Sequence, residues 1–315
     1  MNPLRIIFMG TPEFAVPSLE ILIEHKFNVV AVITAPDKPQ GRGQKLIPSP
    51  VKGCALKYSV PVLQPTNLKS PEFLEELKSY QANLQVVVAF RMLPEVVWTM
   101  PAIGTFNLHA SLLPQYRGAA PINWAIINGE KETGVTTFFL KHEIDTGSII
   151  YQEKEPILDA DNVGTLYERL MKKGAQLVLK TVRAIEAGEY PSIVQPTDIE
   201  IKHAPKIFKE TCQINWNQTS EHVMNFVRGL SPYPAAWAVI ENKTYKIFKV
   251  MKPSPRPSDT PLPGERGRGE GTIYTTDDKT YLYVKTSDGW ISIEELQPEG
   301  KKKMTIQEFL RGNKI

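Results

Sequence analysis

The first half of the chain alternates short apolar runs with helical patterns, and this alternation restricts the possible folds more than any other feature. Runs rich in valine and isoleucine that are apolar at nearly every position are typical of strands buried on both faces of a sheet. They occupy residues 4–10, 29–34, 84–90 and 104–110, with helical patterns at 14–26 and 71–81. Parallel strands need such crossovers, so the pattern predicts an α/β fold with a doubly wound, Rossmann-like parallel sheet.

Two further strand-like runs follow the parallel pattern. They cover residues 135–143 and 148–157, and the turn Ile-Asp-Thr-Gly at 144–147 joins them. Because the connection is short and ends in glycine, we expect these two strands to be neighbours in the same domain.

A long helix and a linker complete this part of the chain. Thr165 and Glu168 have the spacing of a capping box, which predicts the start of the helix, and Gly188 predicts its end. Residues 189–205 contain three prolines and no sustained periodicity. The sequence therefore predicts a domain over 1–188 and a linker over 189–205.

The pattern changes to short, closely spaced strands in residues 206–315. One short helix is expected within 214–230, and five strand-like runs follow at 235–242, 243–252, 269–276, 279–289 and 290–300. Many short strands with turn signals between them predict a small OB-like β-barrel domain. The segment 253–271, rich in proline, glycine and arginine, is expected to be a loop.

Composition sets broad limits on the protein class. Cys54 and Cys212 form no ligand pattern, so we expect two reduced thiols and no metal site. The opening residues lack a signal-peptide pattern and no stretch has membrane-spanning length, so we expect a cytoplasmic protein without membrane contact. The net charge is +3, and residues 206–315 carry 17 Lys and Arg against 13 Asp and Glu. This mild excess is compatible with a polyanionic partner.

Two polar residues share one face of the strand at 104–110. Asn107 and His109 are two positions apart, so both side chains leave the same side of the strand, at the carboxyl end where open α/β sheets bind ligands. Asp145 follows in the turn at 144–147, in a segment that can fold back toward the strand ends. An amide, an imidazole and a carboxylate together supply a donor, a base and an orienting charge, which favours direct group transfer without a covalent nucleophile.

Several segments together resemble the methionyl-tRNA formyltransferase family. They are FMGTPEFAVPSL, PDKPQGRGQKLIPSPVK, NLHASLLPQYRGAAPINWAI, IDTG and HAPKIFKETCQINW, which span nearly the whole chain in order. The resemblance implies a Rossmann-like formyltransferase domain followed by an OB-like domain that binds tRNA. It also implies transfer of a formyl group from 10-formyltetrahydrofolate to the α-amino group of methionine on initiator tRNA.

The resemblance also implies roles for individual residues. Asn107, His109 and Asp145 match the catalytic positions of the family. The folate site is expected along Ser111, Leu112, Leu113 and Pro114. The donor is a folate substrate, no metal is expected, and we expect a monomer.

The segment 37–52 is long for a loop of an α/β domain, which suggests a function. Gly41 and Gly43 flank Arg42 in it, and lysines add further positive charge. By the resemblance, this loop enters the acceptor-stem end of initiator tRNA, so Arg42, Lys38 and Lys45 are the expected tRNA-binding residues. A guanidinium can meet phosphates and splayed bases there by bidentate hydrogen bonds and stacking.

Two alternatives remain open on the residues alone. One is another folate-dependent formyltransferase with a ribonucleotide or amino-sugar acceptor, which would share the catalytic strand. The other is a non-catalytic RNA-binding protein that uses the OB-like domain. The intact trio of Asn107, His109 and Asp145 favours an enzyme, and an activity assay separates the three possibilities.

Overall fold

A computed structural model describes residues 3–40, 45–196, 198–253, 266–269 and 272–313. The chain forms two compact units that are not continuous in sequence. The first comprises residues 1–118, 132–156 and 167–203, and the second comprises 119–131, 157–166 and 204–315.

The first unit is built on a seven-stranded sheet with the order β10-β9-β7-β6-β1-β2-β5. Its strands are β1 Ile6–Gly10, β2 Val29–Ile33, β5 Val62–Leu63, β6 Leu84–Val88, β7 Gly104–His109, β9 Glu132–Phe139 and β10 Ile149–Pro156. β5, β2, β1, β6 and β7 are mutually parallel, whereas β9 and β10 are antiparallel additions at one edge. The expected doubly wound sheet is confirmed, and the strand order reverses direction between β1 and β6.

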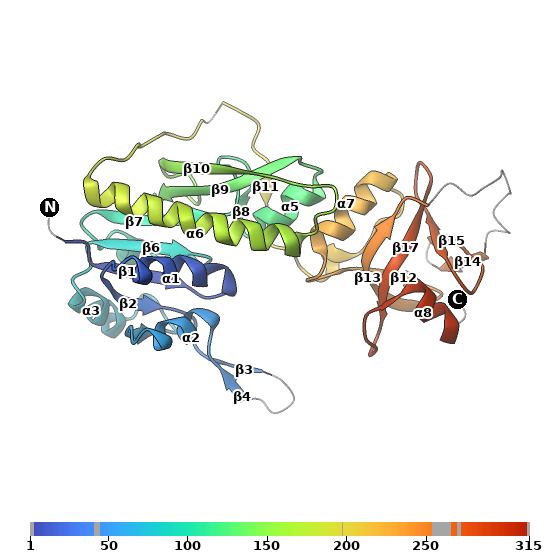
Figure 1. The fold of residues 1–315 in the computed structure, drawn as a ribbon, viewed down its shortest axis with the longest axis horizontal. Helices are drawn as coiled ribbons and strands as arrows, with labels where there is room; N and C mark the ends of the chain where they lie inside the picture. Colours follow the sequence, from blue (N-terminus) through green and yellow to red (C-terminus); the bar gives the residue numbers. More distant parts are fainter. Residues whose placement is uncertain (1–2, 41–44, 197, 254–265, 270–271, 314–315) are drawn as a thin grey trace. The chain divides into compact units, whose positions relative to one another are not determined.

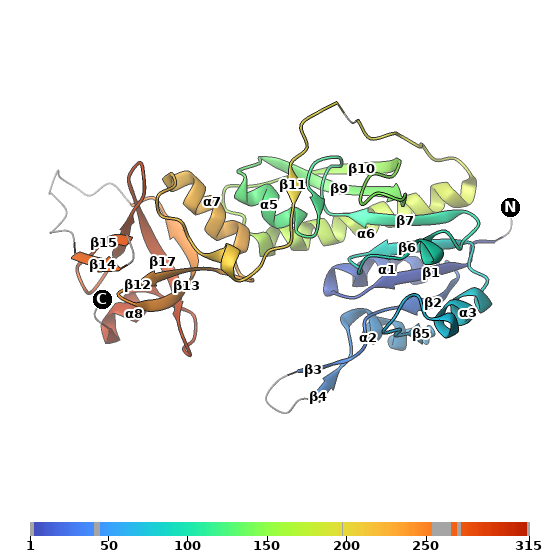
Figure 2. The same ribbon diagram turned by 180° about the vertical axis from the view of Figure 1, so that it is seen from behind.

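Helices cover both faces of this sheet. They are α1 Val16–Glu24, preceded by the 3-10 turn η1 Glu13–Ala15, α2 Pro50–Lys57, α3 Pro71–Ser79, α4 Glu95–Trp98 and α6 Val163–Ala187. α1 and residues 167–187 of α6 lie over the face seen in Figure 1. On the opposite face (Figure 2), Phe73 and Leu77 of α3 and Val97 of α4 pack in one apolar cluster with Ile7 and Met9 of β1. The sheet is therefore shielded from water on both sides, as its apolar strands require.

The long helix α6 begins earlier than the expected capping box at Thr165 and Glu168. Asn162 and Thr165 cap each other: the Thr165 amide donates to Asn162 Oδ1, and the Asn162 amide donates to Thr165 Oγ1, both at 3.1 Å. The helix thus starts at Val163, three residues earlier than a capping box with Thr165 as its N-cap would place it. Its end before Gly188, whose φ is +73°, is as expected.

The segment 37–52 contains more regular structure than a loop. β3 Lys38–Gln40 pairs with β4 Lys45–Ile47, and α2 starts at Pro50 with Ser49 as its N-cap. Lys52 therefore lies in a helix, and its Nζ forms an ion pair with Asp37 Oδ2 at 2.6 Å. Hydrogen bonds from Lys52 and Gln64 hold the pKa of Asp37 below its usual value. The positive charge of Lys52 is balanced within the protein.

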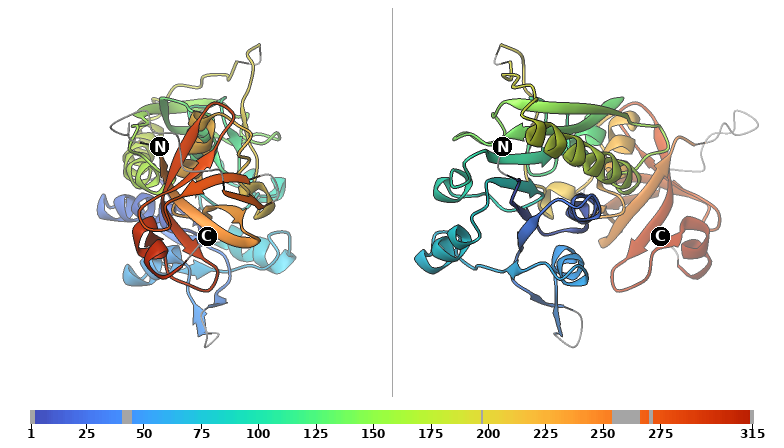
Figure 3. Two further views of the ribbon diagram at one scale, coloured as in Figure 1. Left: turned by 90° about the vertical axis from the view of Figure 1, so that its right-hand side faces the viewer. Right: turned by 60° about the vertical axis from the view of Figure 1, so that its left-hand side comes forward.

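The second unit contains a curled antiparallel sheet with the order β12-β13-β17-β16-β15-β14, and β18 pairs with β17. The strands are β12 Ala236–Ile240, β13 Lys243–Met251, β14 Arg266–Gly269, β15 Thr272–Thr276, β16 Leu282–Lys285, β17 Trp290–Pro298 and β18 Met304–Thr305. The edge strands β12 and β14 approach each other, so the sheet forms a half-barrel (Figure 3, left). The expected OB-like architecture is confirmed, with β14 formed inside the segment expected to be a loop.

Three helices accompany this half-barrel. They are α5 Pro121–Ile127, α7 Ser220–Leu230 and α8 Ile306–Gly312, and a 3-10 turn η2 covers Glu210–Cys212. α5 comes from the sequence between β8 Arg117–Gly118 and β9, yet Ile127 packs in the core of the second unit and Asn123 Nδ2 donates to the Gly229 carbonyl at 2.8 Å. This packing is why the second unit includes residues 119–131.

Asp277 caps the turn after β15, and its replacement by asparagine is expected to lower stability in a pH-dependent way. Burial raises its pKa, but hydrogen bonds from the Thr280 hydroxyl and from the amides of Thr280, Lys279 and Tyr281 outweigh this and lower the pKa to about 2. A depressed carboxyl pKa stabilises the fold above the unfolded value near 3.8, and this contribution is lost as the pH falls through about 2. Because Asp277 is solvent-exposed, we expect Asp277→Asn to lose only about 1 kcal/mol at pH 7.

Urea unfolding of the Asp277→Asn variant and the parent chain at pH 7 and pH 3 measures this difference. The gap in unfolding free energy should narrow at pH 3. A gap that is the same at both pH values would show that the Asp277 charge has no part in stability.

Candidate active site

The site is built around the carboxyl end of β7. This strand pairs with parallel β6 on one side, where Asn107 lies opposite Val87, and with antiparallel β9 on the other, where His109 lies opposite Thr136. Asn107 and His109 occupy alternate positions of β7, so both side chains leave the same face. β7 is thus the boundary strand between the parallel part of the sheet and its antiparallel edge.

Asn107 carries a buried polar atom without a partner. Its Oδ1 is buried and accepts no hydrogen bond among the residues that the structure describes. An unpaired buried amide oxygen costs about 1–3 kcal/mol, so such a group is retained where a ligand can satisfy it. The Asn107 oxygen is therefore a candidate acceptor for a ligand.

His109 is held through one ring nitrogen. The side chain is 7% exposed, and its Nε2 lies 2.9 Å from the carbonyl oxygen of Tyr116. A carbonyl only accepts hydrogen bonds, so Nε2 carries the proton and donates. The neutral ring then has its lone pair on Nδ1, and that nitrogen is the one that can exchange a proton with a substrate.

Asp145 lies in the connection between β9 and β10. The chain leaves β9 where the Leu140 amide donates to the Thr105 carbonyl at 2.8 Å, and the turn folds back so that Asp145 Oδ2 accepts from the Gly118 amide at 3.0 Å. Asp145 has a φ of +56°, an uncommon conformation for a residue other than glycine. A side chain at Gly147 would place its Cβ 1.6 Å from the Phe139 carbonyl oxygen, which explains the glycine of the IDTG turn.

His109 and Asp145 are connected through a shared segment rather than directly. The described hydrogen bonds of their side chains end on Tyr116 and Gly118, two residues apart in the chain. Tyr116 has a φ of +59° and Gly118 a φ of +126°, so the segment makes an unusual backbone turn between the two attachment points. The imidazole of His109 and the carboxylate of Asp145 are therefore both hydrogen-bonded to the backbone of residues 116–118.

The expected folate-binding segment forms the loop after β7. Ser111, Leu113 and Pro114 are buried, and Leu112 is partly exposed. The Ser111 hydroxyl donates to the Gln115 carbonyl at 2.6 Å, and Thr136 Oγ1 donates to the Ser111 carbonyl at 2.6 Å. Gln152 Nε2 donates to the Leu113 carbonyl at 2.9 Å. The loop is firmly held by internal hydrogen bonds.

The expected tRNA-binding residues belong to the β3–β4 hairpin. Lys38 is the first residue of β3 and is exposed, and Lys45 is the first residue of β4. Arg42 lies outside the described residues. The hairpin is anchored at its base by Gln64, whose Nε2 donates to the Ala35 carbonyl at 2.7 Å and to Asp37 Oδ1 at 2.8 Å.

No group of three or more His, Cys, Asp or Glu able to hold a metal ion occurs within the described ranges. Cys54 and Cys212 are buried free thiols, and burial raises the pKa of Cys54 to about 11. None of the described helices is long and apolar enough to cross a membrane.

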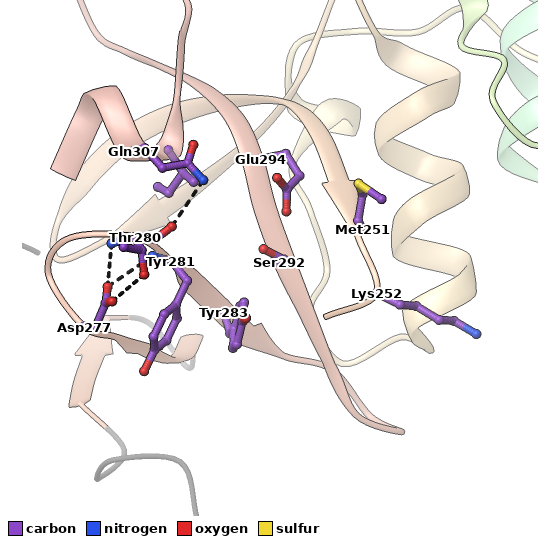
Figure 4. A pocket seen from close by; sticks show the side chains of 10 residues that line it. Met251, Lys252, Asp277, Thr280, Tyr281, Tyr283, Ser292, Glu294 and Gln307 are labelled. Carbon is purple, nitrogen blue, oxygen red and sulfur yellow. Dashed lines mark hydrogen bonds between the residues drawn. The ribbon is translucent and has the colours of Figure 1, made fainter. Parts of the chain in front are cut away.

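A cavity of about 650 Å³ lies in the second unit. The residues that line it do not include Asn107, His109 or Asp145. Figure 4 shows its lining, including the stacked rings of Tyr281 and Tyr283, with centroids 4.4 Å apart, and the side chains of Glu294 and Lys252. The Asp277 carboxylate at its edge is occupied by its own turn.

Comparison with known proteins identifies the family. Residues 4–182 match the formyl transferase family model, and residues 206–314 match the model of the formyl transferase C-terminal domain. A methionyl-tRNA formyltransferase of Bacteroides fragilis is 54% identical over 98% of this chain and 95% of its own. One of Parabacteroides distasonis is 54% identical over 99% and 96%. The chain belongs to the methionyl-tRNA formyltransferase family. It is accordingly an enzyme of the formyltransferase class.

A solved structure supports the fold of this formyltransferase. HypX from Aquifex aeolicus in complex with tetrahydrofolic acid superposes with a TM-score of 0.62 at 19% identity, covering 98% of this chain and 47% of that one. At this identity the similarity concerns the fold alone. It supports a fold in which one chain contains both the parallel sheet and the curled half-barrel.

Sequence reasoning missed three residues that form hydrogen bonds around the candidate site. They are Tyr116, Arg117 and Gln195. Tyr116 and Arg117 lie in the motif YRGAAP, so the motif itself was a signal. Gln195 lies in the segment interpreted as a linker, but it is 3% exposed, and a buried glutamine is unusual for a linker.

Proposed function

We propose that this protein transfers the formyl group of 10-formyltetrahydrofolate to the α-amino group of methionyl initiator tRNA, for translation initiation. The observation that carries the proposal is the similarity to methionyl-tRNA formyltransferases over nearly the full chain, combined with the buried side-chain oxygen of Asn107, which has no partner among the described residues. The compartment in which we expect this reaction is the cytoplasm, with the protein acting as a monomer and without a metal.

The chemistry that we propose uses three side chains. The methionine amine attacks the formyl carbon, a C–N bond forms, and negative charge develops on the formyl oxygen. The Asn107 amide donates to this oxygen, and a donor so placed is often worth about 3 kcal/mol. His109, with Nε2 engaged by Tyr116, acts through Nδ1: it accepts the proton of the attacking amine and, once protonated, donates. The bond to N10 of the folate then breaks. N10 takes up the proton that His109 accepted from the amine, so the proton count balances.

Asp145 supports this proton transfer by its charge. A carboxylate held near an imidazole stabilises the imidazolium that forms during the reaction. Its attachment to Gly118, two residues from the carbonyl that holds His109, supports such a role. We assign folate binding to Ser111, Leu112, Leu113 and Pro114, where the tightly hydrogen-bonded loop offers a preformed wall.

The domain roles follow from the same proposal. Residues 1–188 bind the folate and carry out the transfer, 189–205 link the parts, and 206–315 bind tRNA. The two family matches, over 4–182 and 206–314, support this division.

An acceptor comparison tests the proposed function. The full chain is incubated with 10-formyltetrahydrofolate and methionyl initiator tRNA, and formyl-methionine is measured after release from the tRNA. Parallel reactions use uncharged initiator tRNA, methionyl elongator tRNA, an amino-sugar nucleotide and an aminated ribonucleotide. We expect formylation of methionyl initiator tRNA alone. Formylation of a sugar or ribonucleotide instead would replace the proposal with the corresponding transferase.

Arg42→Ala is expected to lower kcat/KM for methionyl initiator tRNA by roughly 10- to 100-fold, because a bidentate contact is worth about 1–3 kcal/mol. The KM for folate should not change. Arg42→Lys is expected to restore part of the loss, since a point charge lacks the planar fork of a guanidinium. Lys38→Ala and Lys45→Ala should give smaller losses that vanish at high salt.

The matched control is Arg91→Ala, an arginine of the same unit whose guanidinium donates to the carbonyls of Pro65 and Thr66. The kcat/KM of Arg91→Ala for methionyl initiator tRNA should equal that of the parent chain. Unchanged tRNA kinetics for Arg42→Ala would remove the hairpin from the tRNA-binding surface.

A further inference from the structure

Gln195 is a buried polar residue in the segment that follows α6. It is 3% exposed and follows an antiparallel bridge at the sheet edge, where the Ile193 amide donates to the Ile149 carbonyl at 2.9 Å and the Ile149 amide donates back at 2.8 Å. This bridge fixes the chain two residues before Gln195. The side chain is thereby directed into the first unit, toward the start of β10.

Every hydrogen-bonding position of the Gln195 amide is used. Nε2 donates to the carbonyl of Asp145 at 2.7 Å and to the carbonyl of Gly147 at 2.9 Å. Oε1 accepts from Arg117 Nη2 at 2.6 Å and from Arg117 Nε at 3.3 Å. One side chain therefore joins the turn that carries Asp145 to the residue between Tyr116 and Gly118.

These contacts complete a closed set of hydrogen bonds around Asp145. The Asp145 carboxylate is held by the Gly118 amide, the Asp145 carbonyl by Gln195, and Gln195 by Arg117, the neighbour of Gly118. A residue other than glycine with φ near +56° is strained by about 1–3 kcal/mol and keeps that conformation only when its surroundings impose it. Gln195 supplies the hydrogen bonds that impose it from the backbone side.

We propose that Gln195 is a positioning residue of the formyl-transfer reaction, which holds the Asp145 turn in register with the segment that also holds His109. The inference rests on the proposed function, because it acts on the same reaction. All four hydrogen-bonding positions of the Gln195 amide are engaged by protein groups, so we assign it no contact with a substrate. Its effect passes through Asp145, so its loss lowers the rate of transfer and not the binding of either substrate.

The first test replaces Gln195 with methionine or with glutamate. Gln195→Met keeps the length of the side chain and removes all four hydrogen bonds. Gln195→Glu keeps oxygens for Arg117 and removes both donors to the turn. A displacement of about 1 Å at a reacting group can cost roughly 100-fold in rate, so we expect both variants to lose about 10- to 100-fold in kcat. KM for folate and for methionyl initiator tRNA should stay within about 3-fold of the parent values.

The second test combines Gln195→Met with Asp145→Asn. If Gln195 acts through the Asp145 carboxylate, its replacement has little left to disturb in the Asp145→Asn background, and kcat should fall by less than about 3-fold further. A merely structural role would give the same fold-loss in both backgrounds. Single-turnover measurements with saturating enzyme keep the slow variants measurable.

The control is Gln85→Met, a change of another buried glutamine. Gln85 is 1% exposed and its Oε1 accepts from the Thr105 hydroxyl at 2.9 Å, so the change carries a similar structural cost without touching the Asp145 turn. It should lower the melting temperature and leave kcat within about 3-fold. If Gln195→Met does not fold, the kcat of Gln195→Glu alone tests the proposed role of Gln195.

The outcomes separate this inference from the proposed function. A parent chain without formylation of methionyl initiator tRNA would overturn the proposed function. An active parent chain with a Gln195→Glu variant of unchanged kcat, or with additive losses in the double variant, would overturn the role of Gln195 and leave the proposed function standing.

Discussion

Replacing His109 or Asn107 with alanine is expected to lower kcat by about 100- to 10,000-fold for the histidine and by about 100- to 1,000-fold for the asparagine. In the proposed mechanism both side chains stabilise charge that develops during the attack, so we expect their loss to lower kcat while the KM for tRNA stays close to the parent value. The buried oxygen of Asn107 has no protein partner in the described residues, so its removal should cost little stability or even stabilise the fold.

Single-turnover formylation and thermal unfolding of the same preparations measure the two effects. His142→Ala is the matched control for the histidine, since His142 is largely exposed with a long 3.9 Å contact to Glu95. Asn67→Ala serves for the asparagine, because Asn67 is exposed and caps its own loop through the Lys69 amide. Activity equal to that of the parent chain in either active-site variant would end the catalytic assignment of that residue.

Asp145→Asn is expected to keep the fold and to lose about 100-fold or more in kcat. The asparagine oxygen can still accept from the Gly118 amide, and the backbone contacts to Gln195 do not depend on the side chain. What disappears is the negative charge that stabilises a protonated His109. The melting temperature should therefore change by only a few degrees.

Rates across the pH range distinguish this from a turn cap. If Asp145 only shaped the turn, the variant would have the same pH profile and the same kcat as the parent chain. Asp159→Asn, an exposed aspartate with 95% of its side chain accessible, should leave both unchanged.

The parallel strands β1, β2, β6 and β7 were predictable because each is mostly apolar and needs a helical crossover to reach its neighbour, whereas the two-residue parallel strand β5 was not predicted. The position of Asn107 and His109 at the end of β7 followed from the same argument. Helix α2 was missed because Pro50 and Gly53 are typical loop residues, although proline after a serine N-cap also begins helices. Helix α8 was missed despite the capping box of Thr305 and Glu308, a signal that the sequence contained.

The organisation around Asp145 was not predictable in the same way. Gln195 contacts Asp145 across 50 residues and Arg117 across 78, and no local pattern encodes such contacts. Asn162 and Thr165 are both acceptable caps, and only the folded geometry shows that they cap each other. Periodicity identifies elements, whereas long-range partners of buried polar groups depend on how those elements meet.

The segment 116–118 holds His109 through a carbonyl and Asp145 through an amide, and both are groups that every residue other than proline possesses. No side chain in the segment is chemically required for these two attachments. What the sequence must allow is two uncommon backbone dihedral angles, a φ of +59° at Tyr116 and a φ of +126° at Gly118. Glycine reaches the second value without strain, whereas side chains rarely adopt it. Grafting this pair of catalytic groups onto another scaffold therefore means reproducing two dihedral angles before choosing any amino acid.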